Sequence, residues 1–282
     1  MSQPTAPPEA APSRGAGPGP SRRGILFGAI AGVVVAIAVA LGFTFFGGDG
    51  SSTDPSSVAA GEVPAGEIPV SSTYTELTGA PADPDPMGTT NGLVVHPIRE
   101  TPVRDAPDGR PIARMETTQF GDTWLPVIAE QPGWVQVLLP SKPSSTTGWI
   151  RADDLERAVT PYVIRVHLGA KKLQLVQDDK VVDEWSVGIG TPETPTPTGR
   201  TFLLGAFTNP NETYSSVFLP LGVHSPTLDS FGGGPGTVAI HAWPDASSFG
   251  NAVSNGCIRV PNDALQKLAK VPLGTLVIID EE

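Results

Sequence analysis

The stretch Ser254-Asn255-Gly256-Cys257-Ile258-Arg259 holds the only cysteine in a chain of 282 residues. Because a lone cysteine has no internal disulfide partner, it is either a small buried apolar residue or a functional thiol. His241 lies upstream, at the end of the apolar run 237–240, and a strand there would hold its ring on a rigid element. Imidazole is the usual base that converts a thiol into a nucleophilic thiolate. The residues predict a nucleophile and its base, with a buried structural pair as the alternative.

The glycine before the thiol suits covalent chemistry at this position, because glycine lets another backbone approach closely. The backbone N–H groups of Gly256 and Cys257 would face the oxyanion that forms when a thiolate attacks a carbonyl group. This stretch therefore fits a site where a thiolate attacks a carbonyl group.

The same residues resemble the signature of the L,D-transpeptidase (YkuD) catalytic domain, which is a histidine, a spacer and then Ser/Thr-(His)-Gly-Cys-Ile/Val-Arg/Asn. The resemblance implies that Cys257 is the nucleophile, that His241 is its base and that the backbone carbonyl of Ala242 is the third member of the site. Two positions depart from the pattern. Asn255 stands where many members carry a second histidine, and Ala242 stands where glycine or serine is common.

The resemblance also implies the substrate, a peptidoglycan stem tetrapeptide cut between its third residue and the terminal D-alanine. A thioester on Cys257 would pass to an amine of a neighbouring stem and give a 3-3 cross-link, and carbapenem-type β-lactams would acylate the same thiol. Three alternatives stay open, namely an L,D-carboxypeptidase, attachment of another protein to the stem, and a wall-binding module with weak catalysis. No cofactor is expected.

Further residues are expected to bind substrate. Ser254 would hold the loop by hydrogen bonding, Asn255 would affect substrate orientation, and Arg259 would pair either with a substrate carboxylate or with a structural partner. Tyr214 and Phe218 belong to an irregular run, 209–236, which predicts a lid or substrate loop. The sequence shows no metal-ligand spacing of His, Cys, Asp and Glu, so no metal site is expected.

The composition argues against nucleic acid as a partner and leaves the oligomeric state open. The formal net charge is −11. Because phosphate contacts depend on Lys and Arg, this charge argues against a nucleic-acid-binding protein.

The N-terminal part predicts a membrane anchor. Residues 1–23 read as a disordered cytoplasmic tail, and residues 24–46 form an uncharged run of 23 residues. As a helix that run would reach about 34 Å, enough to cross a bilayer. Arg22 and Arg23 precede the run and Asp49 follows it, which predicts a single-pass protein of the cell membrane with its catalytic domain on the cell-wall side. A cleaved signal peptide is the alternative.

Two further segments precede the catalytic stretch. Residues 47–90 are rich in Pro, Gly and Ser and predict a linker. Residues 91–158 resemble bacterial SH3 (SH3b) domains, which implies either a wall-binding module or a rigid spacer. The motifs that carry this resemblance are Val103-Arg104-Asp105-Ala106-Pro107-Asp108-Gly109, Gly133-Trp134-Val135 and Gly148-Trp149-Ile150.

Residues 160–282 are expected to form the catalytic domain. Apolar residues alternate along 162–168, and Asp178-Asp179 separates two apolar runs as in a hairpin. A short helix is predicted to start near Asn262, and a strand over 275–279. The expected fold is mainly β, with a small SH3-like barrel followed by a YkuD-like β-sandwich that carries a short helix after the cysteine.

Overall fold

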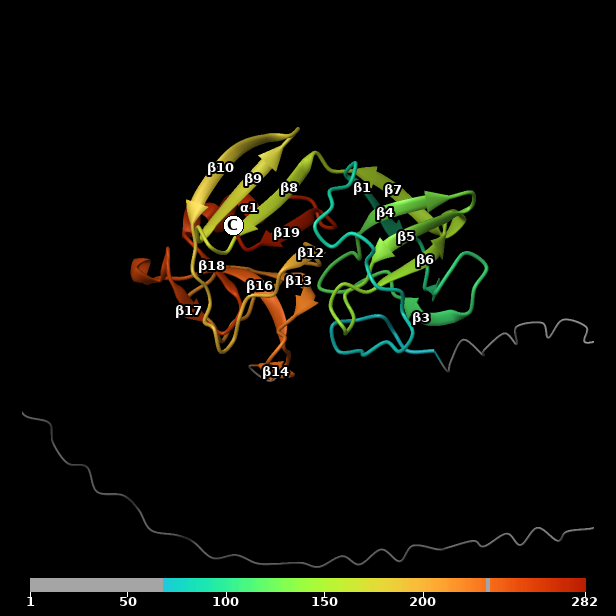
Figure 1. Cartoon of the computed structure of the whole chain (residues 1–282), viewed down its shortest axis with the longest axis horizontal. Helices are drawn as coiled ribbons and strands as arrows, with labels where there is room; N and C mark the ends of the chain where they lie inside the picture. Colours follow the sequence, from blue (N-terminus) through green and yellow to red (C-terminus); the bar gives the residue numbers. More distant parts are fainter. Residues whose placement is uncertain (1–67, 232–233) are drawn as a thin grey trace, which may run out of the picture. The chain divides into compact units, whose positions relative to one another are not determined.

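The computed structural model describes residues 68–231 and 234–282. These residues fold mainly as β-strands, as predicted (Figure 1). The strands are β1 (Leu93–Pro97), β2 (Thr101–Arg104), β3 (Pro111–Met115), β4 (Leu125–Gln131), β5 (Trp134–Leu138), β6 (Thr147–Arg151), β7 (Leu155–Val159), β8 (Tyr162–His167), β9 (Lys172–Gln177), β10 (Lys180–Ser186), β11 (Ile189–Gly190), β12 (Gly199–Phe202), β13 (Phe218–His224), β14 (Ser230–Phe231), β15 (Gly234–Pro235), β16 (Thr237–Ala242), β17 (Ala252–Ser254), β18 (Ile258–Val260) and β19 (Leu276–Asp280). Two 3-10 turns, η1 (Ala152–Asp154) and η2 (Ala246–Ser248), and the helix α1 (Asn262–Leu268) complete the elements.

The first seven strands form one sheet in the order β3-β2-β6-β5-β4-β1-β7. Its turns follow the local sequence. Pro132 and Gly133 connect β4 to β5, and Gly133 has a φ of +79°, which the second central position of a type II turn requires. The resemblance of this region to SH3b domains stays a prediction.

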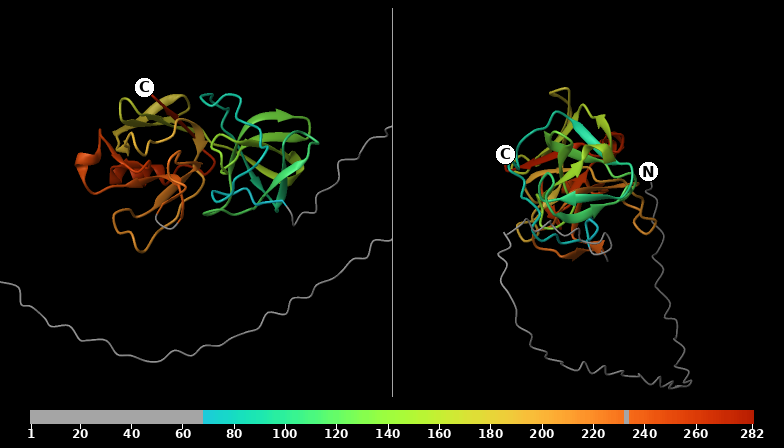
Figure 2. Two further views of the ribbon diagram at one scale, coloured as in Figure 1. Left: turned by 60° about the horizontal axis from the view of Figure 1, so that its bottom comes forward. Right: turned by 90° about the vertical axis from the view of Figure 1, so that its right-hand side faces the viewer.

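The later strands form two main sheets that share one core (Figure 2). The order is β10-β9-β8-β19-β12 in the first and β13-β16-β18 in the second, and α1 packs its Ala264, Leu265 and Leu268 into the core between them. The predicted hairpin is formed by β9 and β10. Asp178 and Asp179 both have positive φ, 48° and 61°, as the two central residues of a type I′ turn do.

Strand β19 joins the two strand assemblies, because its side chains alternate between two cores. Val277 and Ile279 lie in the core with α1, whereas Leu276 and Ile278 lie with Phe202 in the core of the seven-stranded sheet. Successive side chains of a strand point to opposite faces, so a continuous apolar run fits a strand that is covered on both sides.

Residues 68–90 differ from the predicted linker, because they pack on the folded body. Leu77 is 4% exposed, and the Asp83 carboxylate accepts two hydrogen bonds of 2.6 Å from Nε and Nη2 of Arg200 on β12. The proline and glycine content of residues 68–90 favours a linker. Composition carries no information about an ion pair with a residue more than a hundred positions away.

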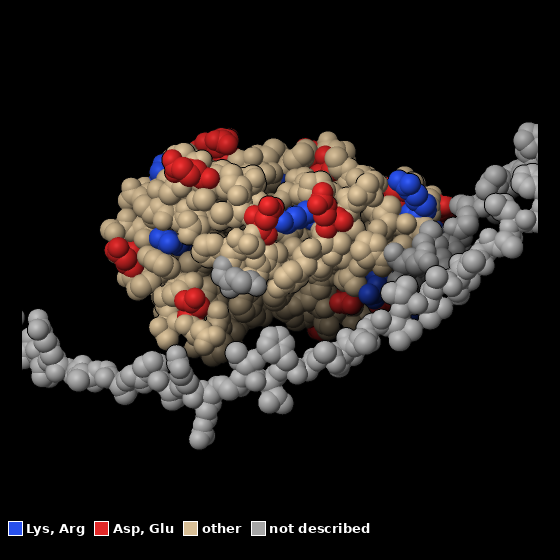
Figure 3. All heavy atoms as spheres, turned by 90° about the horizontal axis from the view of Figure 1, so that it is seen from below, with Lys and Arg blue, Asp and Glu red and all other residues tan. Residues whose placement is uncertain are grey.

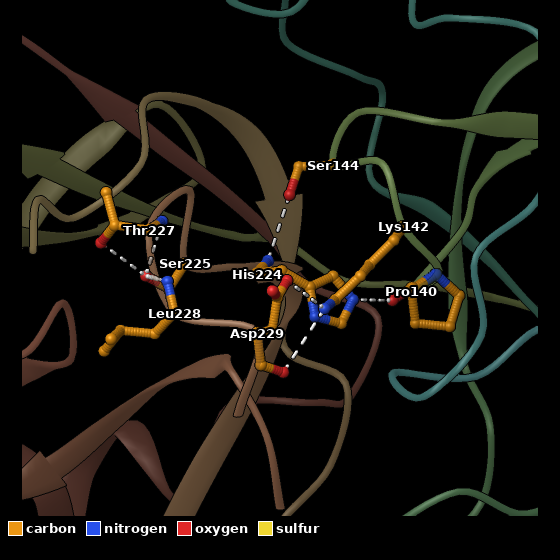
Figure 4. A network of polar contacts seen from close by, with 8 residues as sticks. All are labelled: Pro140, Lys142, Ser144, His224, Ser225, Thr227, Leu228 and Asp229. Atoms are coloured by element: carbon orange, nitrogen blue, oxygen red, sulfur yellow. Dashed lines mark hydrogen bonds and ion pairs between the residues drawn. The ribbon is translucent and has the colours of Figure 1, made fainter. Parts of the chain in front are cut away.

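A second contact joins residues 140–144 to the end of β13 (Figure 4). His224 is 4% exposed, its Nε2 lies 2.8 Å from the carbonyl oxygen of Pro140, and its backbone N–H donates to Oγ of Ser144 over 3.1 Å. Nearby, Nζ of Lys142 lies 3.5 Å from Oδ1 of Asp229. His224 therefore serves as a structural side chain between these segments.

The predicted irregular run 209–236 contains a fully buried strand, β13. Pro220 and Gly222 read as breakers in the sequence, but Gly222 is needed for packing. A Cβ on Gly222 would lie 2.4 Å from the ring of Phe202, so only glycine leaves room for that ring.

The predicted membrane location is wrong for the part of the chain that the structure describes. In residues 68–231 and 234–282, no helix has both the length and the apolar character needed to cross a bilayer. Helix α1 has seven residues, about 10 Å at 1.5 Å per residue, against a hydrocarbon core of about 30 Å. The run 24–46, where the anchor was predicted, lies outside the described residues.

Candidate active site

Strands β16 and β18 bring the predicted nucleophile and base to one place. They pair in parallel, with Ile240 opposite Ile258 and His241 opposite Arg259. Cys257 comes directly before β18, so this register sets it beside Ala239, one position before the paired isoleucines. His241 and Cys257 line the same cavity, which has a volume of about 280 Å³.

The ring of His241 is held by its neighbour. Nδ1 lies 2.9 Å from the carbonyl oxygen of Ala242, and because a carbonyl can only accept, Nδ1 must carry the proton. Nε2 is then the unprotonated nitrogen that can act as a base. The N–H of Ala242 donates over 3.0 Å to Oγ of Ser215, which in turn donates to the Val217 carbonyl, so the acceptor for Nδ1 is itself fixed.

Aromatic rings surround His241. Tyr214 and Phe218 each have their ring centroid 5.5 Å from that of His241, and Trp243 lies at 5.9 Å. His241 is 6% exposed, and burial lowers its pKa below the ordinary value of 6.5, with the charge of Arg259 adding to this and the Ala242 hydrogen bond opposing it. The imidazole is therefore neutral at pH 7.

The thiol of Cys257 is also neutral in this environment. Burial raises its pKa above the ordinary value, and this outweighs a hydrogen bond with the Ala239 backbone and the positive charge of Arg259, which both favour the thiolate. The free protein thus holds a neutral thiol and a neutral imidazole at pH 7. Proton transfer between them has to accompany attack on a substrate.

Ser254 forms hydrogen bonds within the cysteine loop. Its Oγ donates to the Cys257 carbonyl over 2.5 Å and accepts from the N–H of Gly256 over 3.2 Å. The Gly256 N–H, predicted as an oxyanion donor, is therefore engaged with Ser254. Gly256 has a φ of +106°, a conformation that side-chain-bearing residues rarely adopt.

Two threonines, Thr194 and Thr196, stabilise the cysteine loop by hydrogen bonds. Oγ1 of Thr196, which is 4% exposed, donates to the Gly256 carbonyl over 2.9 Å and accepts from the N–H of Gly190 over the same distance. Oγ1 of Thr194 donates to the Ser254 carbonyl over 3.1 Å. The contacts of Thr194 with Ser254 and of Thr196 with Gly256 join positions sixty residues apart, so no local pattern of residues indicates them.

The other predicted substrate-binding residues divide into two groups. Tyr214 and Phe218 line the cavity with Cys257 and His241. Asn255 is exposed and does not line it, and neither does Arg259. The guanidinium carbon of Arg259 lies 3.6 Å from the ring centroid of Trp243, so the described structure gives this side chain a stacking partner and not a carboxylate.

Several cavity residues were not predicted. Glu212 was within the run singled out as a substrate loop, but a single carboxylate there gave no separate signal. Tyr74 and Phe120 come from the parts predicted as linker and SH3-like domain, so only the tertiary structure brings them to this site.

One group of possible metal ligands lies in the described residues, although none was predicted. Ligand atoms of His167, Asp280 and Glu282 lie within 4.8 Å of one another. His167 Nδ1 is 2.9 Å from Oδ1 of Asp280, and this hydrogen bond accounts for their proximity without an ion. None of the three lines the cavity that contains Cys257.

Comparison with known proteins agrees with the geometry. Residues 161–279 match the family model of the L,D-transpeptidase catalytic domain. The Bacillus subtilis protein named "Putative L,D-transpeptidase YkuD" is 29% identical over 167 residues, which cover 57% of this chain and 94% of that protein. "Putative L,D-transpeptidase YqjB" of the same organism is 34% identical over 128 residues, which cover 43% of this chain and 72% of that protein. The solved structure of an L,D-transpeptidase from Mycobacterium smegmatis is 16% identical, with a TM-score of 0.34 over 55% of this chain and 99% of that chain. By its match to the family model and its similarity to these two Bacillus proteins, the chain belongs to the family that carries the L,D-transpeptidase (YkuD) catalytic domain.

Proposed function

We propose that this protein is a peptidoglycan L,D-transpeptidase that forms 3-3 cross-links between stem peptides through a thioester on Cys257. The observation that carries the proposal is the arrangement of His241. Its Nδ1 proton is held by the Ala242 carbonyl, which leaves Nε2 as a base in the cavity that also contains the lone thiol.

The first step is acylation. As Cys257 Sγ attacks the carbonyl carbon between the third residue and the terminal D-alanine, its proton passes to Nε2 of His241. The imidazolium then gives that proton to the leaving D-alanine amine as the C–N bond breaks. The product is a thioester, and the imidazole returns to its neutral form.

The oxyanion of this step is assigned to the backbone N–H of Cys257. The N–H of Gly256 is bonded to Ser254 in the free protein, so Gly256 and Ser254 are assigned to shaping the loop. Within residues 68–231 and 234–282, the Cys257 N–H donates no hydrogen bond outside the strand ladders. A donor without an internal partner is what a developing oxyanion requires.

The second step decides between cross-linking and hydrolysis. An amine of a neighbouring stem attacks the thioester carbon, loses a proton to His241 and expels Cys257, which gives the cross-link. Water in place of the amine would release a tripeptide, which is the reaction of an L,D-carboxypeptidase.

The test uses the full chain with disaccharide-tetrapeptide, followed by mass spectrometry of protein and products. We expect a thioester adduct and a dimer that has lost one D-alanine, both absent for Cys257→Ala. Tripeptide monomer as the sole product would replace the proposal by a carboxypeptidase. If the protein gives neither adduct nor product, and a thermal unfolding transition shows that it is folded, the catalytic proposal is wrong for this substrate.

A further inference from the structure

The cavity that contains Cys257 has one charged side chain among its described lining residues. Of the described residues that line it, Glu212 is the only Asp, Glu, Lys or Arg. A ligand in this cavity therefore meets one negative charge and no positive one. An anionic group, such as the terminal carboxylate of a peptide, finds no lysine or arginine partner among these lining residues.

The rest of the lining is largely aromatic. Rings form a continuous series in which Phe120 lies 5.5 Å from Phe207, Phe207 lies 5.5 Å from Phe218, and Phe218 lies 5.6 Å from Tyr214. The faces of aromatic rings carry negative potential and attract cations. A carboxylate beside such rings is a combination that binds an ammonium group.

Glu212 is placed to act on this cavity. It is half-buried, and its N–H donates to the carbonyl of Asn209 over 3.1 Å, which closes the turn that carries it. Within residues 68–231 and 234–282, no Lys, Arg or His forms an ion pair with it. Its negative charge reaches Tyr214, whose pKa is raised by burial and then by Glu212, and Tyr214 is itself in contact with His241.

Part of the cavity lining comes from outside the matched residues 161–279. Phe120 follows β3, and its carbonyl accepts from the N–H of Ala206 over 3.2 Å, while a Cβ on Gly205 would lie 2.5 Å from the Cβ of Phe120. Glycine at 205 thus permits this close approach. The region around Phe120 is therefore fixed against the catalytic half and helps to enclose the ligand.

We propose that Glu212, together with the rings of Phe120, Phe207 and Tyr214, forms a subsite for the side-chain ammonium of the acceptor stem. The proposal rests on the proposed function, because it assigns the acceptor of the thioester as an amine and not water. It also assigns part of the acceptor site to Phe120, which lies outside the matched residues 161–279.

The protons balance in this scheme. The bound ammonium loses one proton to solvent through the Glu212 carboxylate and becomes a neutral amine. The nitrogen forms a bond to the thioester carbon, the C–S bond breaks, and the second proton passes by way of Nε2 of His241 to the Cys257 sulfur. The products are the amide cross-link, the free thiol and one proton released to solvent.

The experiment separates donor from acceptor. The donor is a disaccharide-tetrapeptide whose side-chain amine is acetylated, so that it can acylate Cys257 but cannot accept. The acceptor is the disaccharide-tripeptide, which keeps the side-chain amine but lacks the terminal D-alanine and so cannot acylate Cys257. It is added over a range of concentrations, and the readouts are the acylation rate and the acceptor concentration that gives half-maximal dimer. Glu212→Gln keeps the size of the side chain and removes its charge.

We expect Glu212→Gln to raise the half-saturating acceptor concentration about tenfold and to change the rate of acylation by the acetylated donor by a smaller factor. The matched control is Glu156→Gln, which removes the same charge from an exposed position on β7 and should match the wild type. An unchanged half-saturating concentration for Glu212→Gln would overturn the subsite while leaving the transpeptidase intact. Absence of acylation in the wild type would instead overturn the proposed function.

A second measurement decides the matter if Glu212→Gln does not fold. In the wild type, raising the salt concentration should screen the carboxylate–ammonium attraction and raise the half-saturating acceptor concentration, without changing acylation by the acetylated donor. A half-saturating concentration that is independent of salt would overturn the subsite.

Discussion

Replacing Asp83 by alanine should cost the chain about 3 to 5 kcal/mol of unfolding free energy, the range for removing one partner of a buried ion pair. Asp83 and Arg200 are joined by two hydrogen bonds of 2.6 Å, and their side chains are 0% and 4% exposed. Without the carboxylate, the guanidinium stays buried, with the Gly88 carbonyl, 3.2 Å from Nη1, as its remaining partner. The loss is therefore far larger than for an exposed ion pair.

The assay is urea unfolding of the full chain, with the variants Asp83→Ala, Arg200→Met and the double variant compared in a thermodynamic cycle. The double variant should be more stable than Asp83→Ala, because it removes the uncompensated charge. Asp229→Ala is the control. It breaks the exposed pair with Lys142 and should cost at most about 1 kcal/mol. If Asp83→Ala also costs less than about 1 kcal/mol, the pair is not buried and residues 68–90 are not docked on the catalytic half.

Three further predictions concern the active site. Burial lowers the pKa of His241 below 6.5, so the imidazole stays neutral as the pH falls to that value. The acid limb of the pH profile for carbapenem acylation of Cys257 should therefore have its midpoint below pH 6.5. A midpoint at or above pH 6.5 would contradict the assigned burial effect. Gly256→Ala should lower the free energy of unfolding in urea by about 1 to 3 kcal/mol and remove most of the acylation rate, because φ is +106° at this position. Wild-type values for this variant would show that the loop does not need this conformation. Thr196→Val keeps the shape of the side chain but leaves the Gly256 carbonyl and the Gly190 N–H unpaired. It should lower the free energy of unfolding by about 1 to 3 kcal/mol and slow acylation. The control Thr213→Val, at an exposed position, should change neither.

The local elements were predictable where a short pattern fixes the backbone. The alternation in β8, the Asp178-Asp179 turn and the helix after the cysteine depend on neighbouring residues, and the structure contains all three. The helix begins at Asn262, with Pro261 as its N-cap. Strand β13 was missed, because Pro220 and Gly222 act as breakers in most sequences and the ring of Phe202 that needs Gly222 is distant in the chain.

The sequence by itself determined the family of this protein and its candidate catalytic residues. A lone cysteine, a histidine and the residues around them identify the family, because catalysis constrains residue types within a short stretch. The tertiary structure decided which contacts hold these residues and which side chains line their cavity. It engages the Gly256 N–H with Ser254, braces the loop with Thr196, and brings Glu212 and Phe120 to the cavity. These contacts depend on strand register and on packing between distant segments, and no local pattern of residue types encodes either one.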